Sequence, residues 1–268
     1  MTPFGERLRG AWERSGSLLC VGLDPDTSKI PSQFSRSPLP IFEFNREVVD
    51  ATHDLVCAYK PQIAFYSAAG AELELERTID YIRRRAPHAL VILDAKRGDV
   101  GNTAIAYARE AFGRYGADAV TVNPYMGEDS VRPFLTDPTR GALVLCRTSN
   151  SGARDFQDLL VDGRPLYRHV AERAAREWNV LGNVLFVVGA TYPEEMSILR
   201  RAHPEIPFLV PGIGTQGGDL EATLNAGLDV RKQGLIISSS RAIVFAGDAS
   251  EIRRAAKQLR DEINSLRG

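Results

Sequence analysis

The sequence predicts an α/β protein of the (β/α)8 TIM-barrel class, in which eight parallel strands close into a barrel. Eight short apolar runs rich in β-branched residues recur along the chain, and stretches with helical spacing of apolar residues lie between them. The length of 268 residues is close to the roughly 250 residues that one such barrel needs. No interdomain linker or low-complexity segment divides the sequence, so residues 1–268 are expected to form a single domain.

The expected elements alternate in chain order. Continuous apolar runs are typical of strands that are buried on both faces, as in a parallel sheet covered by helices. The expected strands are 18–23, 55–59, 90–93, 119–122, 142–146, 184–188, 207–210 and 234–237. The expected helices are 42–53, 68–85, 103–115, 166–178, 193–202, 219–226 and 250–266. This number of units in about 250 residues favours a closed barrel over an open doubly wound sheet.

Two polar stretches interrupt the alternation and are interpreted as long loops. Residues 24–40 are rich in Pro and Ser and show no periodicity, and residues 147–166 follow the fifth expected strand. In a barrel both loops extend the rim at the carboxyl ends of the strands, where barrel enzymes have their active sites.

The charge balance excludes several classes of partner. With 33 Lys and Arg against 34 Asp and Glu, the chain has no overall field that would attract nucleic acid or an anionic membrane. No apolar run approaches the roughly 18 residues needed to cross a bilayer, and the N-terminus lacks the apolar core of a signal peptide. We therefore expect a cytoplasmic protein, in which any anionic ligand must be held by local groups.

Cysteine and histidine do not suggest a metal centre. Cys20, Cys57 and Cys146 lie far apart in apolar surroundings and are expected to be buried free thiols of a reducing compartment. The four histidines are scattered, so neither a zinc site nor a Ser-His-Asp triad is indicated.

The segment "DAKRGDVGNT", residues 94–103, places several charges directly after an apolar strand. A solvated turn is one explanation. The other is a pocket in which opposite charges face one another. In a barrel the carboxyl ends of the first three strands converge, and this would bring together Asp24, Lys60, Asp94 and Lys96. Asp94 and Lys96, two residues apart, would point to the same side of an extended strand. For one residue solvation is the simpler explanation, but for four on consecutive strands a shared site is favoured.

Loops after the seventh and eighth expected strands indicate a phosphate site. The stretch "VPGIGTQGGD", residues 210–219, contains four glycines before a helix, and Arg241 closes the last strand. Glycines let backbone N–H groups approach an anion, and an arginine can bind it with two hydrogen bonds. After the fifth strand, Ser149 and Asn150 offer neutral donors and acceptors that suit the amide edge of a heterocycle, although a local turn explains them equally well.

These residues together resemble the orotidine 5′-monophosphate decarboxylases. The segment 94–103 is similar to the Asp-x-Lys-x-x-Asp signature of that family, in the wording of its longer bacterial branch (type 2). Further similar motifs follow in the family's order over nearly the whole chain: "GLDPD", "YKPQIAFY", "TSN", "VVGATYPEEM", "PGIGTQGGD" and "SSSRAI".

The resemblance implies a carboxy-lyase that converts orotidine 5′-monophosphate to uridine 5′-monophosphate and carbon dioxide, the last step of de novo pyrimidine synthesis, without metal or organic cofactor. It makes Lys96 the ammonium group that stabilises and protonates the ring carbon. Asp94 would stand near the substrate carboxylate, and Lys60 would hold the charge network together. Asp99 and Thr103 would be contributed by the neighbouring subunit of a homodimer with shared active sites.

The resemblance also implies the remaining substrate contacts. Asp24 corresponds to the ribose contact, Ser149 to the pyrimidine contact, and Gln216 and Arg241 to the phosphate contacts. Ser240 departs from the family's pattern, because many relatives have glycine before the arginine. This difference bears on the backbone contact to phosphate.

Two other functions fit parts of the pattern. A sugar-phosphate enzyme that stabilises an enediolate on magnesium shares the Asp-x-Lys-x-x-Asp spacing, but it needs carboxylate ligands where this chain has Lys60 and Lys96. A non-catalytic nucleotide-binding barrel would retain the phosphate loops alone. The presence of all four charged residues, Lys60, Asp94, Lys96 and Asp99, argues against it.

Overall fold

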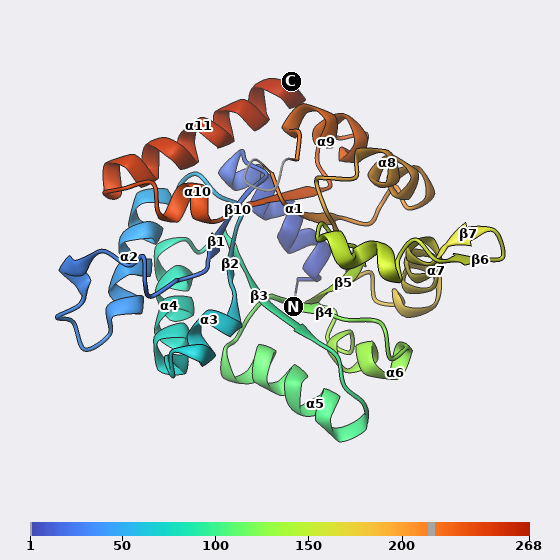
Figure 1. Ribbon diagram of the computed structural model, residues 1–268, viewed down its shortest axis with the longest axis horizontal. Helices are drawn as coiled ribbons and strands as arrows, with labels where there is room; N and C mark the ends of the chain where they lie inside the picture. The colour runs from blue at the N-terminus through green and yellow to red at the C-terminus, as the bar shows by residue number, and fades with distance from the viewer. Residues whose placement is uncertain (1, 214–217) are drawn as a thin grey trace.

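The strands form one closed parallel barrel. The computed structural model describes residues 2–213 and 218–268, and there the strands follow the order β1-β10-β9-β8-β5-β4-β3-β2. Figure 1 shows the helices arranged around this barrel. The barrel strands are β1 (Leu19–Leu23), β2 (Ala58–Pro61), β3 (Leu90–Arg97), β4 (Ala119–Val122), β5 (Gly141–Arg147), β8 (Val184–Val188), β9 (Phe208–Pro211) and β10 (Leu235–Ser239). The predicted (β/α)8 fold is confirmed.

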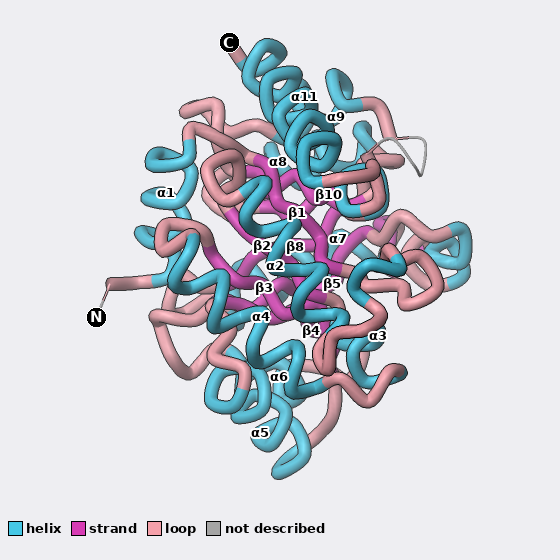
Figure 2. The backbone as a smooth tube through the Cα atoms, turned by 90° about the vertical axis from the view of Figure 1, so that its left-hand side faces the viewer, coloured by secondary structure: helices cyan, strands magenta, loops and turns pink. Residues whose placement is uncertain are grey.

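Helices cover the outer face of the barrel, as the side view in Figure 2 shows. Within the described residues, no helix is both long and apolar enough to cross a membrane. The α-helices are α1 (Phe4–Ser15), α2 (Pro40–Thr52), α3 (Ile63–Ala68), α4 (Glu72–Arg85), α5 (Gly101–Arg109), α6 (Glu128–Val131), α7 (Leu166–Arg173), α8 (Pro193–Ala202), α9 (Leu220–Gly227), α10 (Arg241–Val244) and α11 (Ala249–Arg267). Five-residue π-helical segments, Glu110–Arg114 and Ala174–Trp178, continue α5 and α7.

The helix expected at 68–85 begins only at Glu72 in the structure, as α4, and a separate short helix that was not expected, α3, ends at Ala68. Gly70 lies between α3 and α4 with a φ of 63°, in the left-handed region that a right-handed helix cannot include. The apolar spacing of α4 extends backward into this break, so periodicity alone did not reveal it.

Further elements were not expected, among them α6, α10, the N-terminal helix α1 and a short hairpin. The helix α1 precedes the first strand and buries its apolar side, and a short hairpin interrupts the polar stretch 147–166. The hairpin strands β6 (Leu160–Val161) and β7 (Arg164–Pro165) are joined by Asp162 and Gly163, which both have positive φ, as a tight hairpin turn requires. Figure 1 shows the hairpin projecting beside α7.

The barrel interior and its surroundings contain the three thiols. Cys20, Cys57 and Cys146 are buried and free, which confirms the interpretation from the sequence. Burial raises the pKa of Cys20 and of Cys146 to about 12, so both remain protonated thiols at neutral pH.

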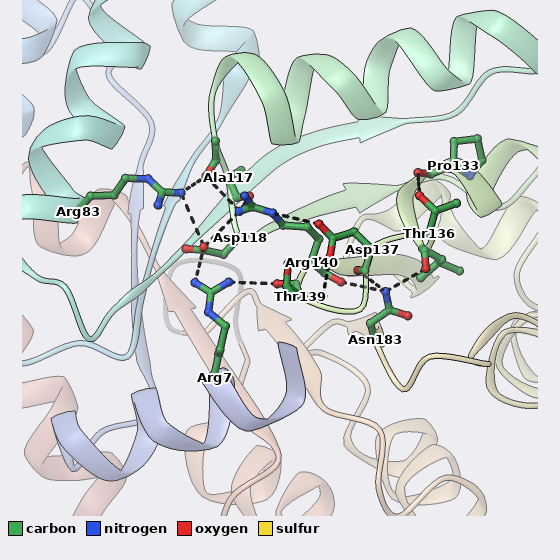
Figure 3. A network of polar contacts seen from close by, with 12 residues as sticks. Arg7, Arg83, Ala117, Asp118, Pro133, Thr136, Asp137, Thr139, Arg140 and Asn183 are labelled. Atoms are coloured by element: carbon green, nitrogen blue, oxygen red, sulfur yellow. Dashed lines mark hydrogen bonds and ion pairs between the residues drawn. The ribbon is translucent and has the colours of Figure 1, made fainter. Parts of the chain in front are cut away.

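The buried carboxylate of Asp118 lies at the end of the barrel opposite the carboxyl ends of the strands, and several arginines surround it (Figure 3). Asp118, directly before β4, accepts a hydrogen bond from the backbone N–H of Val91 at 2.8 Å. Its other oxygen lies 2.5 Å from the guanidinium of Arg7 in α1 and 3.5 Å from that of Arg140, and Arg83 also faces it at 3.7 Å. A buried charge needs such partners, and here they attach α1 to the barrel.

Candidate active site

A cavity of about 850 Å³ opens at the carboxyl ends of the strands. Residues from consecutive strands and from the loops after β5 and β10 form its wall. Those that the sequence singled out are Asp24, Lys60, Asp94, Lys96, Ser149, Asn150 and Arg241. The expectation that the strand-end charges meet in one place is confirmed.

Asp94 is the centre of a charge network at the floor of this cavity. One of its oxygens lies 3.0 Å from the ammonium nitrogen of Lys60, and the other lies 2.6 Å from that of Lys96. Lys60 is also 4.0 Å from a carboxylate oxygen of Asp24. Signs therefore alternate along Asp24, Lys60, Asp94 and Lys96, which lets the buried charges of Lys60 and Asp94 coexist.

The network keeps its members ionised. Burial acts to raise the pKa of Asp94, but the two neighbouring ammonium groups outweigh it and hold that pKa well below its usual range. Burial likewise acts to lower the pKa of Lys60, but the charges of Asp94 and Asp24 outweigh it and raise that pKa. Both side chains are consequently charged at neutral pH.

Thr121, at the end of β4, completes the network and was not identified from the sequence. Its hydroxyl donates to Asp94 at 2.9 Å and accepts from the backbone N–H of Lys96 at 2.9 Å. This side chain therefore fixes the carboxylate and the lysine backbone together. In the sequence, Thr121 is only a polar residue near the end of an apolar strand. Many strands have such a residue, so this pattern did not indicate a functional role.

The local geometry of Lys96 differs from the expected one. The prediction placed Asp94 and Lys96 on the same side of an extended strand, but Lys96 has a φ of 46° and the pairing of β3 with β4 is irregular between Leu93 and Arg97. The two side chains still meet, because this bulge turns the Lys96 side chain back toward Asp94. A non-glycine residue in the left-handed region is uncommon and is often found at functional sites.

Asp24 lines the cavity with a partly exposed side chain. Its side chain is 21% exposed, and its Oδ1 atom is the one that lies 4.0 Å from Lys60. An ionised carboxylate only accepts hydrogen bonds, so Asp24 suits a hydroxyl group of a ligand.

The loop after β5 carries Ser149 into the cavity wall. A Cβ atom at Gly189, after β8, would lie only 2.8 Å from the Cβ of Ser149, so the glycine permits this close approach. The oxygen of the Asn150 amide accepts from the Thr148 hydroxyl at 2.7 Å. Asn150 thus forms the local turn that the sequence left open, and both Ser149 and Asn150 line the cavity.

The proposed phosphate region is described in part. Arg241 begins α10 and lines the cavity, but Gln216 and its neighbours in 214–217 lie outside the described residues. The Ser240 hydroxyl donates to the backbone oxygen of Gly22 at 3.0 Å, so it is directed toward β1. A Cβ atom at Gly22 would lie 2.8 Å from that of Ser240, which shows how closely the two strands' ends pack.

Asp99 and Thr103 do not line the cavity of their own chain. Asp99 accepts a hydrogen bond from the backbone N–H of Val100 at 2.8 Å, and Thr103 is exposed on α5. Within residues 2–213 and 218–268, no group of three or more His, Cys, Asp or Glu side chains could hold a metal ion.

Comparison with known proteins gives one family for the whole chain. The model of the Orotidine 5'-phosphate decarboxylase / HUMPS family matches residues 17–256. The orotidine 5'-phosphate decarboxylase of Cellvibrio japonicus is 56% identical over 270 residues, which cover 98% of this chain and 99% of that protein. That of Ralstonia pickettii is 53% identical over 268 residues, with 98% and 99% covered.

The fold agrees with these sequence relationships. The structure of Leishmania donovani OMP decarboxylase superposes with a TM-score of 0.87 at 42% identity and covers 99% of both chains. The chain therefore belongs to the Orotidine 5'-phosphate decarboxylase / HUMPS family.

Proposed function

We propose that the protein decarboxylates orotidine 5′-monophosphate to uridine 5′-monophosphate, as the names of its full-length relatives indicate. This reaction is the last step of de novo pyrimidine synthesis. The observation that carries the proposal is the ammonium group of Lys96, which Asp94 holds at 2.6 Å at the floor of the cavity. A fixed cation is what the reaction needs, because loss of carbon dioxide leaves an electron pair localised on a ring carbon.

The charge network accounts for each step of the reaction. The bond between the ring carbon and the carboxylate breaks, carbon dioxide leaves, and the electron pair stays on the carbon. Lys96 stabilises that charge and then donates a proton from its ammonium nitrogen to form the new C–H bond. Asp94 keeps Lys96 protonated and in place, and Lys60 neutralises the second carboxylate oxygen.

The rest of the cavity fits the nucleotide. Asp24 and Ser149 line the cavity and are the proposed contacts to the ribose hydroxyls and to the pyrimidine. Arg241, together with Gln216, is the proposed phosphate contact. Phosphate binding far from the reacting carbon supplies energy for ordering the site around the substrate.

Arg241→Ala is expected to weaken substrate binding more than it slows chemistry. The arginine would bind the phosphate in the ground state and in the transition state alike, so its loss should raise KM about 10- to 100-fold, equivalent to one or two charge-assisted hydrogen bonds. Steady-state kinetics by the ultraviolet absorbance of the substrate measure this change. An unchanged KM would refute the phosphate assignment.

We propose that the reaction uses no metal and no organic cofactor. Both oxygens of Asp94 already bind ammonium groups or the Thr121 hydroxyl, which leaves the network ill suited to a hard divalent cation. Turnover by EDTA-treated protein tests this, with magnesium added back in parallel. Activity that is lost with EDTA and restored by magnesium would favour the sugar-phosphate alternative instead.

We also propose a homodimer with shared active sites, in which Asp99 and Thr103 reach the cavity of the neighbouring subunit. The absence of both residues from their own cavity is consistent with this arrangement. The chain would act as a single domain, because the barrel closes between β1 and β10 at the two ends of its sequence. The free buried thiols suit the reducing cytoplasm.

Hybrid dimers should recover activity from two inactive variants. Lys96→Ala and Asp99→Ala would each inactivate both sites of a homodimer. In a hybrid of the two, one site receives Lys96 from one subunit and Asp99 from the other, both unchanged. Hybrid dimers can be made by subunit exchange between the two variants, or by co-expression with a different affinity tag on each. We expect the purified hybrids to have about half of the wild-type activity. Hybrids as inactive as the parents would exclude sharing.

A further inference from the structure

Arg147, the last residue of β5, is a buried cation outside the catalytic network. Only 2% of its side chain is exposed, and it is the largest fully buried side chain of the described residues. An arginine is rarely buried without partners, so its surroundings are informative. The reaction proposed above assigns it no role.

The guanidinium of Arg147 joins three segments. It lies 3.0 Å from a carboxylate oxygen of Asp158 in the loop after β5 and 3.6 Å from one of Glu195 in the first turn of α8. It also stacks over the ring of Tyr192, 3.8 Å from the ring centroid. Its Nε and Nη1 atoms form no hydrogen bond with the described residues, so charge and stacking, rather than hydrogen-bond geometry, hold this group.

These contacts close the loop that carries Ser149. Next to the ion pair of Arg147 with Asp158, Thr148 and Gln157 are joined twice. The backbone N–H of Thr148 donates to the Gln157 side chain at 2.9 Å, and the Gln157 amide donates to the Thr148 hydroxyl at 2.8 Å. Two neighbouring links therefore tie 147–148 to 157–158. The enclosed segment, residues 149–156, contains Ser149 at the cavity wall.

The same arginine also sets the distance of this segment from β8. Its backbone oxygen accepts from the N–H of Gly189 at 2.7 Å, and Gly189 is the residue against which Ser149 packs. With Tyr192 and Glu195 on its other side, Arg147 is held by the β8–α8 connection and in turn holds the loop after β5.

We infer that Arg147 is a positioning residue, which fixes the closed loop 149–156 so that Ser149 meets the pyrimidine of the substrate. The inference rests on the proposed contact of Ser149. Arg147 touches no substrate atom in this arrangement, and it acts only through the loop. Its effect on catalysis should therefore disappear when the Ser149 hydroxyl is absent.

A double-mutant cycle tests the inference through kcat/KM for orotidine 5′-monophosphate. Arg147→Met keeps most of the volume and removes charge and stacking, and a misplaced contact of about 1 Å can cost up to 10²-fold. We expect a 10- to 100-fold loss in the wild-type background, mainly through KM, but less than about 3-fold in the Ser149→Ala background. Arg147→Lys, which keeps the charge without the planar group, should restore part of the loss.

The matched control is Arg200, another buried arginine, which stacks over Phe208 at 3.9 Å and binds backbone carbonyls away from the cavity. Arg200→Met should lower the thermal unfolding midpoint without coupling to Ser149→Ala. Where Arg147→Met folds poorly, Asp158→Asn replaces it in the cycle, because this carboxylate is 41% exposed.

The outcomes separate the two hypotheses. A normal kcat/KM for Ser149→Ala alone would remove the pyrimidine contact and the positioning role with it. A substantial loss for Ser149→Ala, combined with equal effects of Arg147→Met in both backgrounds, would retain that contact and show that Arg147 stabilises the fold only.

Discussion

Lys96→Ala should reduce kcat by about 10⁴- to 10⁷-fold. In the proposed mechanism the ammonium group has two tasks, and each has a typical magnitude. A positioned general acid contributes about 10²–10⁴-fold, and one preorganised group that stabilises a developing negative charge contributes about 10²–10³-fold. Both contributions end when the side chain is removed, because the nitrogen that lies 2.6 Å from Asp94 is the donor for both.

Folding should survive this substitution. The Lys96 side chain is 49% exposed, and Asp94 retains its contacts with Lys60 and Thr121. An ion pair of such exposure contributes little to stability. We expect the thermal unfolding midpoint of Lys96→Ala to stay within a few degrees of the wild type, so that lost activity reports on chemistry.

Lys257→Ala is the matched control for Lys96→Ala. Lys257 forms an ion pair of the same length, 2.6 Å to Asp261, and is 57% exposed, but it lies on α11 away from the cavity. Removal of this lysine should leave kcat and KM unchanged. If Lys96→Ala retained activity within about 10-fold of the wild type, Lys96 could not be the proton donor.

The barrel and the floor of the site could be predicted because both depend on local signals. The apolar runs that became β1, β2 and β3 fix where strands end, and the closed barrel brings Asp24, Lys60 and Asp94 together. Such convergence follows from topology and needs no side-chain detail.

Other features of the site depend on contacts between distant residues and could not be predicted. Arg147 follows a strand and precedes a polar stretch, which indicates a solvated strand end, yet it is buried because Tyr192 and Glu195, more than forty positions further along the chain, enclose it. The positive φ of Lys96 results from a bulge in β3, and nothing in the residue types of "DAKRGD" requires it. Thr121 is an ordinary strand residue until the fold places Asp94 beside it.

Asp94→Asn should lower kcat by about 10²–10³-fold and leave KM close to the wild-type value. Asp94 binds the ammonium groups of Lys60 and Lys96 through different oxygens, so in the proposed mechanism it mainly holds Lys96 in place. A decrease in kcat of this size is typical when one preorganised electrostatic contact is removed. The amide of Asn has one acceptor oxygen in place of two and carries no negative charge, so burial then favours the uncharged form of Lys60.

The control for Asp94→Asn is Asp54→Asn on the outer surface. Hydrogen bonds from Arg253, at 2.7 and 2.8 Å, lower the pKa of Asp54 to about 2, but this carboxylate lies outside the cavity. Its neutralisation should leave kcat and KM unchanged. If only Asp94→Asn lowers kcat, the effect comes from the position of this carboxylate beside Lys96. It does not come from removing a carboxylate of low pKa in general.

The pH dependence of the unfolding free energy tests whether Asp94 is the ionised partner of Lys60 and Lys96 in the folded protein. The pKa of Asp94 is lower in the folded protein than the value of 3.8 that applies without these contacts. The carboxylate therefore stabilises the fold above that pH, and its contribution is lost as pH falls through the folded-state pKa. The difference in unfolding free energy between wild type and Asp94→Asn should be constant from pH 5 to about 8 and should shrink below about pH 4.

The kinetic constants of Asp94→Asn separate two roles of this carboxylate. If Asp94 acted mainly by repelling the substrate carboxylate, its neutralisation would remove ground-state strain, and KM would fall together with kcat. If it positions Lys96, kcat falls while KM stays nearly constant. The geometry favours positioning, because Lys60, Lys96 and the Thr121 hydroxyl already surround both oxygens. A KM that decreased in proportion to kcat would contradict this conclusion and make repulsion the principal role of Asp94.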